Sequence, residues 1–200
     1  MGSPRPFPWV SAALVALAAL LVALPGSGEA LEYDRARVAA GEVWRLATAQ
    51  AVHWTPRMAL ADLGAILVLG AWLERSGQRK RMLVATFLGA ALALAGVALL
   101  LPRLALYRGS SASASALFVL TALEIVRHPP RRGARALALA ALLLFAAKVA
   151  WEALTGQPLF AAPLPPGVAV VPLAHLLGGA AGGLMAISHQ NRPVEPQLGR

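Results

Sequence analysis

The 200-residue chain contains no cysteine, and charged residues make up only 14% of it. Without cysteine there can be no disulfide framework, thiolate zinc site, iron–sulfur cluster or covalently attached c-type haem. The shortage of charge is accompanied by 58% hydrophobic residues and a mean hydropathy of +0.64, whereas soluble domains are roughly 45–50% apolar. We therefore predict a membrane protein that uses neither a metal nor another cofactor.

Apolar runs divide the chain into six segments that approach the roughly 20 residues a helix needs to cross the hydrocarbon core. Their approximate bounds are 10–25, 56–73, 83–101, 110–126, 136–154 and 168–187. Thr55 is expected to cap the second helix, with Pro56 as its first residue. Because the loops are short, residues 1–200 are predicted to form one domain, an all-α bundle of six transmembrane helices.

The first segment has a second interpretation. Its short apolar run follows Arg5 and ends at Pro25 and Gly26, a pattern that is also typical of a signal peptide. Cleavage would leave five spans without changing the placement of the other loops. We favour a retained first span and keep cleavage as the alternative.

Positive charge is concentrated in alternate loops. Although the net charge is +9, Lys and Arg in a membrane protein first report which loops stay in the cytoplasm, and we expect no nucleic-acid partner. The residues on this side are Arg5, Arg75, Arg79, Lys80, Arg81, Arg127, Arg131, Arg132, Arg135, Arg192 and Arg200. Both termini are therefore predicted to be cytoplasmic, and the uncharged loop 155–167 to lie outside.

Ionisable residues inside the spans need partners or a function, because charge in the bilayer is costly. Lys148 and Glu152 are four residues apart, so we expect them to form a structural pair. Glu124 lies near the cytoplasmic surface, where we expect its side chain to snorkel toward water. Asp62 and His175 have no partner in their own segments.

Several polar residues are predicted to share the outer leaflet. The fourth and sixth spans both enter from outside, which places Ser111 and His175 at similar depth, while Met58 and Asp62 begin the second span and His53 precedes it. A neutral imidazole can take the proton of a serine hydroxyl, and free N–H groups at a helix start can hold an oxyanion. The alternatives without catalysis are helix packing for the Ser/Ala run and an interhelical hydrogen bond for the histidine.

Four groups of motifs stand in order along the chain. They are Y-D-R at 33–35 with G-E-V-W-R-L at 41–46 and T-A-Q-A-V-H at 48–53, then Y-R-G-S-S-A at 107–112, K-V-A-W-E at 148–152, and A-H-L-L-G at 174–178 with Gly182. Together they resemble the rhomboid family of intramembrane serine proteases, most closely its rhombosortase branch. Gln50 stands where the branch pattern has a histidine.

The resemblance implies a catalytic dyad in which Ser111, after Gly109 in the G-x-S motif, is the nucleophile and His175 the general base. It also implies a bacterial cytoplasmic membrane protein whose active site faces the periplasmic side. The implied partner, besides the lipid bilayer, is a membrane-anchored protein substrate with a GlyGly-type C-terminal tail, a membrane helix and a basic end.

The chain also departs from the family pattern. Met58 and Asp62 stand where rhomboids generally have H-x-x-x-N, whose side chains help to bind the oxyanion, and an ionised Asp62 would repel that charge. Ala112 replaces the final glycine of the serine motif, and Ser115 replaces a histidine or aromatic residue. These departures, with His53 and Gly109 as the other expected supports, keep open a catalytically silent rhomboid-like protein that binds transmembrane helices. A small transporter with a polar pathway is a third reading.

Overall fold

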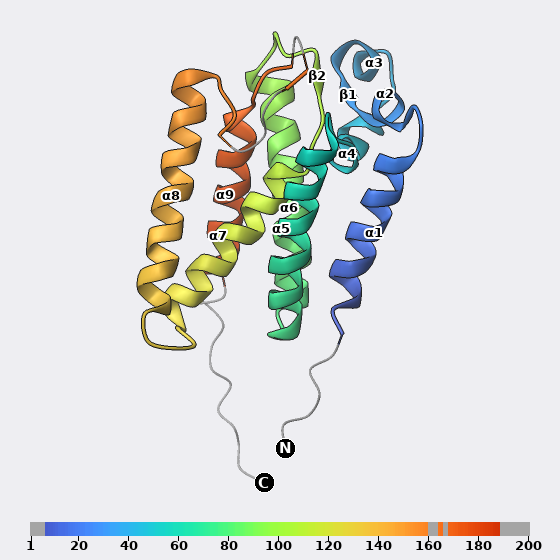
Figure 1. Cartoon of the computed structure of the whole chain (residues 1–200). Coiled ribbons are helices and arrows are strands. Elements are labelled where there is room, and N and C mark those ends of the chain that lie inside the picture. Colours follow the sequence, from blue (N-terminus) through green and yellow to red (C-terminus); the bar gives the residue numbers. More distant parts are fainter. Residues whose placement is uncertain (1–6, 160–163, 166–167, 189–200) are drawn as a thin grey trace.

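The computed structural model describes residues 7–159, 164–165 and 168–188, and it is a bundle of long helices with a cap of short helices and strands at one end (Figure 1). The long helices are α1 (Trp9–Ala23), α5 (Pro56–Arg75), α6 (Arg79–Leu100), α7 (Ser111–Arg127), α8 (Ala134–Thr155) and α9 (Pro172–Ile187). Each overlaps one of the expected segments, and several extend beyond the predicted bounds, α6 beginning at Arg79 rather than at residue 83. By length and composition, α5, α6 and α8 could cross a membrane, so the count of six spans stays a prediction.

The helix starts and ends follow local sequence signals. Thr55 accepts a hydrogen bond from the backbone N–H of Met58, and Pro56 opens α5, as predicted. We expected the last helix from residue 168, but it begins at Pro172. Val171 is non-helical (φ −117°, ψ 79°) because the residue before a proline is disfavoured in the α region, and residues 168–171 form an irregular segment instead.

The connection between α1 and α5, expected to be a loop, contains short elements. They are α2 (Ser27–Leu31), β1 (Tyr33–Asp34), α3 (Arg35–Ala39), α4 (Arg45–Thr48) and the 3₁₀ turn η1 (Ala49–Ala51). Strand β1 pairs antiparallel with β2 (Leu106–Tyr107), with Tyr33 opposite Tyr107. The guanidinium of Arg35 donates to the carbonyls of Val97, Ala98, Leu101 and Leu104 at the end of α6, which satisfies acceptors that a helix end leaves free.

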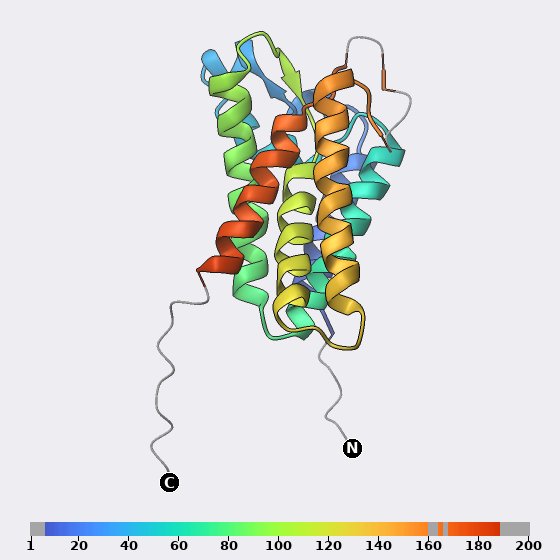
Figure 2. The ribbon, with the colours of Figure 1, turned by 90° about the vertical axis from the view of Figure 1, so that its left-hand side faces the viewer.

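Helix α7 is the centre of the bundle and packs against α5, α6, α8 and α9. Figures 1 and 2 show that it begins well below the end of the bundle that carries β1 and β2. Its contact with α9 is made by main chain: a Cβ on Gly178 would clash with the carbonyl of Ala112, and one on Gly182 with the carbonyl of Ala116. Small residues thus let these two helices approach closely.

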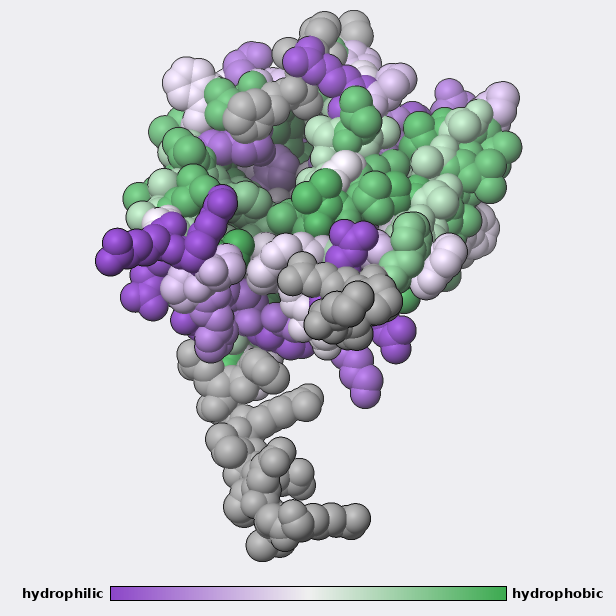
Figure 3. All heavy atoms as spheres, turned by 60° about the horizontal axis from the view of Figure 1, so that its bottom comes forward, coloured by the Kyte–Doolittle hydropathy of each residue, from purple (hydrophilic) through white to green (hydrophobic). Residues whose placement is uncertain are grey.

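The opposite end of the bundle carries the α5–α6 and α7–α8 turns. Figure 3 shows hydrophilic side chains gathered there, below the hydrophobic sides of the helices. The expectation for Glu124 was wrong: its side chain is only 8% exposed and lies 2.7 Å from the guanidinium of Arg81. An ion-pair partner on α6 lets this carboxylate stay inside. Arg5, Gly167, Arg192 and Arg200 lie outside the described residues, and the orientation of the bundle remains a prediction.

Candidate active site

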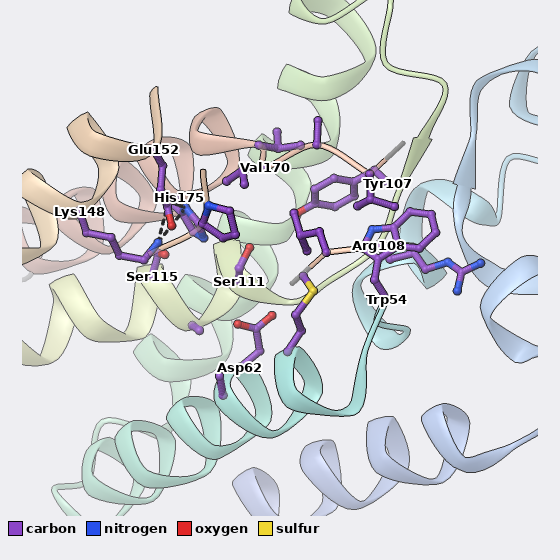
Figure 4. Close-up of a pocket in the computed structure, with 18 of the residues that line it drawn as sticks. Trp54, Asp62, Tyr107, Arg108, Ser111, Ser115, Lys148, Glu152, Val170 and His175 are labelled. Carbon is purple, nitrogen blue, oxygen red and sulfur yellow. Dashed lines mark hydrogen bonds and ion pairs between the residues drawn. The ribbon is translucent and has the colours of Figure 1, made fainter. Parts of the chain in front are cut away.

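A cavity of about 830 Å³ opens among α5, α7, α8, α9, the 103–108 segment and residues 168–171. Both members of the predicted dyad, Ser111 and His175, line it. Figure 4 shows their side chains in this cavity, with Asp62 on the α5 side and Tyr107 on the β2 side. Residues from segments far apart in sequence therefore meet at one place.

Ser111 is the first residue of α7, and the backbone of Gly109 just before it is held by its conformation and by a hydrogen bond. Gly109 has φ +126°, a conformation that favours glycine, and its N–H donates to the carbonyl of Ala49 at 3.0 Å. The first backbone bond of α7 is donated by Ala114 to Ser110. The earlier N–H groups of the helix are thus the free donors that an oxyanion could use.

The serines around Ser111 have different surroundings. Ser110 is buried and its hydroxyl lies 3.2 Å from Nε2 of His53. Ser113 is also buried and donates to the carbonyl of Thr86 on α6. Ser115 lines the cavity one turn along from Ser111. The structure thus separates the cavity serines, 111 and 115, from the two that pack elsewhere.

His175 is joined to α8 by its second ring nitrogen. Its Nδ1 lies 3.0 Å from Oε2 of Glu152 and 3.3 Å from Nζ of Lys148, and these two side chains form their own ion pair at 2.8 Å. The predicted Lys148–Glu152 pair is therefore confirmed, but sequence reasoning missed that it includes the histidine. Residues four apart lie on one helix face, which predicts the pair but not the helix that this face meets.

Ser111 and His175 share the cavity, but no hydrogen bond joins them in the part of the chain that the structure describes. Catalytic hydrogen bonds are often long before substrate binds. The placement is therefore compatible with a dyad that forms during the reaction.

His53 and Asp62 form a second polar group beside the serine. Nε2 of His53 lies 3.3 Å from Oδ2 of Asp62, and the imidazole is fully buried. A Cβ on Gly109 would lie 3.7 Å from the same carboxylate oxygen. The structure therefore unites His53, Asp62 and Gly109, three expected supports, and sequence reasoning did not foresee that Ser110 would join them.

Met58 and Ala112, two further expected supports, lie apart from this group. Met58 lines the cavity from the first turn of α5. Ala112 is fully buried, and its carbonyl faces Gly89 of α6 and Gly178 of α9. Its methyl group serves the helix contacts, so any catalytic contribution of this residue would come from its backbone N–H.

Tyr107 is a cavity residue that the sequence offered only as part of a motif. Burial, and next the negative charge of Asp62, raise the pKa of its phenol to about 12. Ser111 and Gln50 are near enough to act in the opposite sense, although neither makes a hydrogen bond of good geometry with the hydroxyl. Tyr107 thus presents a neutral phenol beside Ser111.

Comparison with protein families decides what kind of protein this is. The Rhomboid domain model matches residues 40–190, more than half of the chain. The chain belongs to the rhomboid family. Rhomboids are generally intramembrane serine proteases, and this rhomboid has apolar helices that fit a membrane protein. A comparison with curated proteins gave no match.

Membership clarifies the chemistry that the site can perform. In this rhomboid Ser111 and His175, the residues that the motif resemblance predicts as nucleophile and base, line one cavity together with Asp62 of α5. Within residues 7–159, 164–165 and 168–188, no three His, Asp or Glu side chains are grouped as metal ligands would be. The described side chains offer nucleophilic and acid–base chemistry.

Proposed function

We propose that this rhomboid is an intramembrane serine protease that cleaves membrane-anchored proteins through Ser111 and His175. The observation that carries the proposal is that these two residues line one cavity at the start of α7. The cavity also meets the free N–H groups of the first turn of α7. A nucleophile, a base and donors for an oxyanion are the parts that acyl transfer requires.

The reaction would proceed in two halves. Nε2 of His175 takes the hydroxyl proton as Oγ of Ser111 attacks the carbonyl carbon of the scissile peptide, and first-turn N–H groups of α7 hold the resulting oxyanion. The imidazolium then gives its proton to the leaving amine as the C–N bond breaks. Water, deprotonated by His175, attacks the acyl carbonyl, and the imidazolium returns the proton to Oγ of Ser111 as the ester bond breaks, which releases the acid and restores the serine.

The depth of Ser111 supports a substrate that comes from the membrane. Helix α7 begins below the end of the bundle that carries the β1–β2 pair (Figures 1 and 2), so the nucleophile lies among the helices. The cavity also has apolar walls, including Leu69, Phe118 and Phe145, which suit an apolar peptide segment.

The motif resemblance supports a finer proposal. We assign the chain to the rhombosortase type, in a bacterial cytoplasmic membrane with six spans and cytoplasmic termini, acting near the periplasmic side. Its substrates would be exported proteins with a GlyGly-type C-terminal sorting tail and a membrane helix. The motifs of loop one, 33–53, and of α8, 148–152, carry this assignment.

The second candidate is a catalytically silent rhomboid that binds transmembrane helices. It is favoured by Asp62, an acidic side chain beside the proposed oxyanion site, and by the lack of a hydrogen bond between Ser111 and His175 within the described residues. In this form the cavity would bind an apolar helix without cleaving it.

Covalent labelling separates the two candidates. The full chain in native membranes is treated with a fluorophosphonate probe, which reacts with an activated serine. A protease labels the wild-type chain and loses labelling in Ser111→Ala, whereas Ser113→Ala, whose hydroxyl faces α6, keeps it. Absence of labelling in a folded wild-type chain would favour the silent form.

A further inference from the structure

The carboxylate of Glu152 is held on the imidazole of His175 from the side away from catalysis. Its Oε2 lies 3.0 Å from Nδ1, and the Glu152 side chain is 3% exposed. Figure 4 shows Glu152 and Lys148 of α8 meeting His175 of α9 at the cavity wall. A buried carboxylate at this distance accepts a hydrogen bond from a protonated Nδ1.

The same carboxylate is fixed by two further donors. Nζ of Lys148 donates to Oε2 at 2.8 Å, and the backbone N–H of Leu159 points to Oε1 at 3.3 Å. Lys148 also neutralises the charge of Glu152, which makes its burial tolerable. The acceptor for the histidine is therefore built into α8 and the chain that follows it.

The geometry creates a choice between two forms of the neutral imidazole. With hydrogen on Nδ1, the ring donates to Glu152 and keeps a lone pair on Nε2 for the serine proton. With hydrogen on Nε2, Nδ1 would instead accept from Lys148, whose Nζ is 3.3 Å away, and Nε2 could not act as a base. Glu152 favours the first form and Lys148 the second.

We infer that Glu152 is a positioning residue that holds His175 in the form with hydrogen on Nδ1, so that the site works as Ser111–His175–Glu152 and not as a dyad alone. The inference rests on the proposed protease function for its catalytic consequence. During attack, Glu152 also stabilises the imidazolium that forms when Nε2 takes the serine proton. The carboxylate itself keeps its charge throughout.

A structural ion pair predicts a different pattern of losses. If Lys148 and Glu152 only neutralise each other, removing either side chain leaves an unpaired buried charge and lowers stability and activity. Removing both leaves no unpaired charge, so stability and activity should recover. If Glu152 positions His175, the double variant stays impaired. The buried Arg81–Glu124 pair, at 2.7 Å and far along α7 from Ser111, offers a matched control.

The first experiment measures kcat, KM and thermal stability of the full chain in membranes or detergent for four variants. We expect Glu152→Gln to lower kcat about 10²- to 10⁴-fold with little change in KM, because its amide can donate to Nδ1 and select the wrong form. Lys148→Met should lose less, and Lys148→Met/Glu152→Gln should remain as slow as Glu152→Gln. Glu124→Gln should change stability without a selective loss of kcat.

Equal losses in the two α8 single variants, with recovery in the double variant, would overturn the inference. The double variant also covers the case in which Glu152→Gln alone fails to fold, because it leaves no unpaired buried charge.

The second experiment does not need activity. The chain has four histidines, so ¹⁵N-histidine NMR with His175→Ala as the assignment control resolves the ring nitrogens of His175. We expect hydrogen on Nδ1 in the wild-type chain and on Nε2 in Glu152→Gln. Hydrogen on Nε2 in the neutral wild-type ring would refute the positioning role, even in an active enzyme. An unreactive Ser111 with the expected wild-type form would refute only the protease function.

Discussion

The carbonyl oxygen of Ala112 in α7 lies so close to Gly178 of α9 that a Cβ would not fit at that position. Ala112 follows Ser111 directly, and Gly178 is three residues after His175. The main-chain contact that closes the bundle therefore lies beside the two residues proposed to react. This position links packing and catalysis more tightly than a contact elsewhere in the bundle would.

Gly178→Ala should destabilise the protein by about 1–3 kcal/mol, because the added methyl meets a backbone carbonyl that cannot turn away. Thermal unfolding in detergent measures the effect. Gly183→Ala is the matched control on the same helix, where a Cβ would meet nothing within 4 Å. Equal melting temperatures for the two variants would contradict the close α7–α9 contact.

Ser111→Ala and His175→Ala should each abolish labelling and cleavage, and the double variant should lose little more, since nucleophile and base act as a unit. Ser110→Ala and Ser113→Ala should retain activity, because neither residue lines the cavity; the Ser110 hydroxyl contacts His53, and the Ser113 hydroxyl donates to the carbonyl of Thr86. Ser115 shares the cavity, so it is the informative rival. If Ser111→Ala still labels, or if a folded Ser115→Ala no longer labels, the nucleophile is a serine other than Ser111.

Asp62→Asn should match or exceed the wild-type cleavage rate. An amide keeps a contact with His53, removes a negative charge from the oxyanion site and adds a donor. Initial rates on one substrate measure the effect, with melting temperature as the check on folding. A strong loss of activity would instead give Asp62 a role as an anion.

Tyr107 predicts a pH dependence of stability. Its pKa of about 12 in the folded chain exceeds the ordinary value of 10. Between these values the unfolded chain releases a proton that the folded chain keeps, so the free energy of unfolding falls as pH rises. The slope is about 1.4 kcal/mol per pH unit from this group. Tyr107→Phe should flatten the decline between pH 10 and 12, and an unchanged slope would count against a buried phenol.

Reporter fusions test the orientation. Reporters near Arg79 and Arg131 should be active in the cytoplasm, and one in the loop that contains Gly167 should be active outside, because positive loops are retained. If the loop 155–167 were found in the cytoplasm, the predicted orientation of the bundle in the membrane would be the reverse of the true one. The cavity would then open to the other side of the membrane.

The helices could be predicted from the sequence because long apolar runs and caps such as Thr55 and Pro56 are local signals. The meeting of Ser111 and His175 in one cavity also followed from depth and small residues. The contacts of His175 with α8, and of His53 with Ser110, could not be predicted, because the sequence carries no local signal for which face of one helix meets its neighbour. Glu124 was misjudged for the same reason: Arg81, its partner, lies on another helix.

The backbone contact between α7 and α9 also fixes the distance between these two helices near Ser111 and His175. Since no side chain separates Gly178 from Ala112, the spacing of nucleophile and base does not depend on the rotamers of intervening residues. We therefore do not expect a bound peptide to widen the cavity by separating α7 from α9. We expect substrate to enter past the other walls, α5 and the irregular segment 168–171, because α8 carries the two side chains that contact His175.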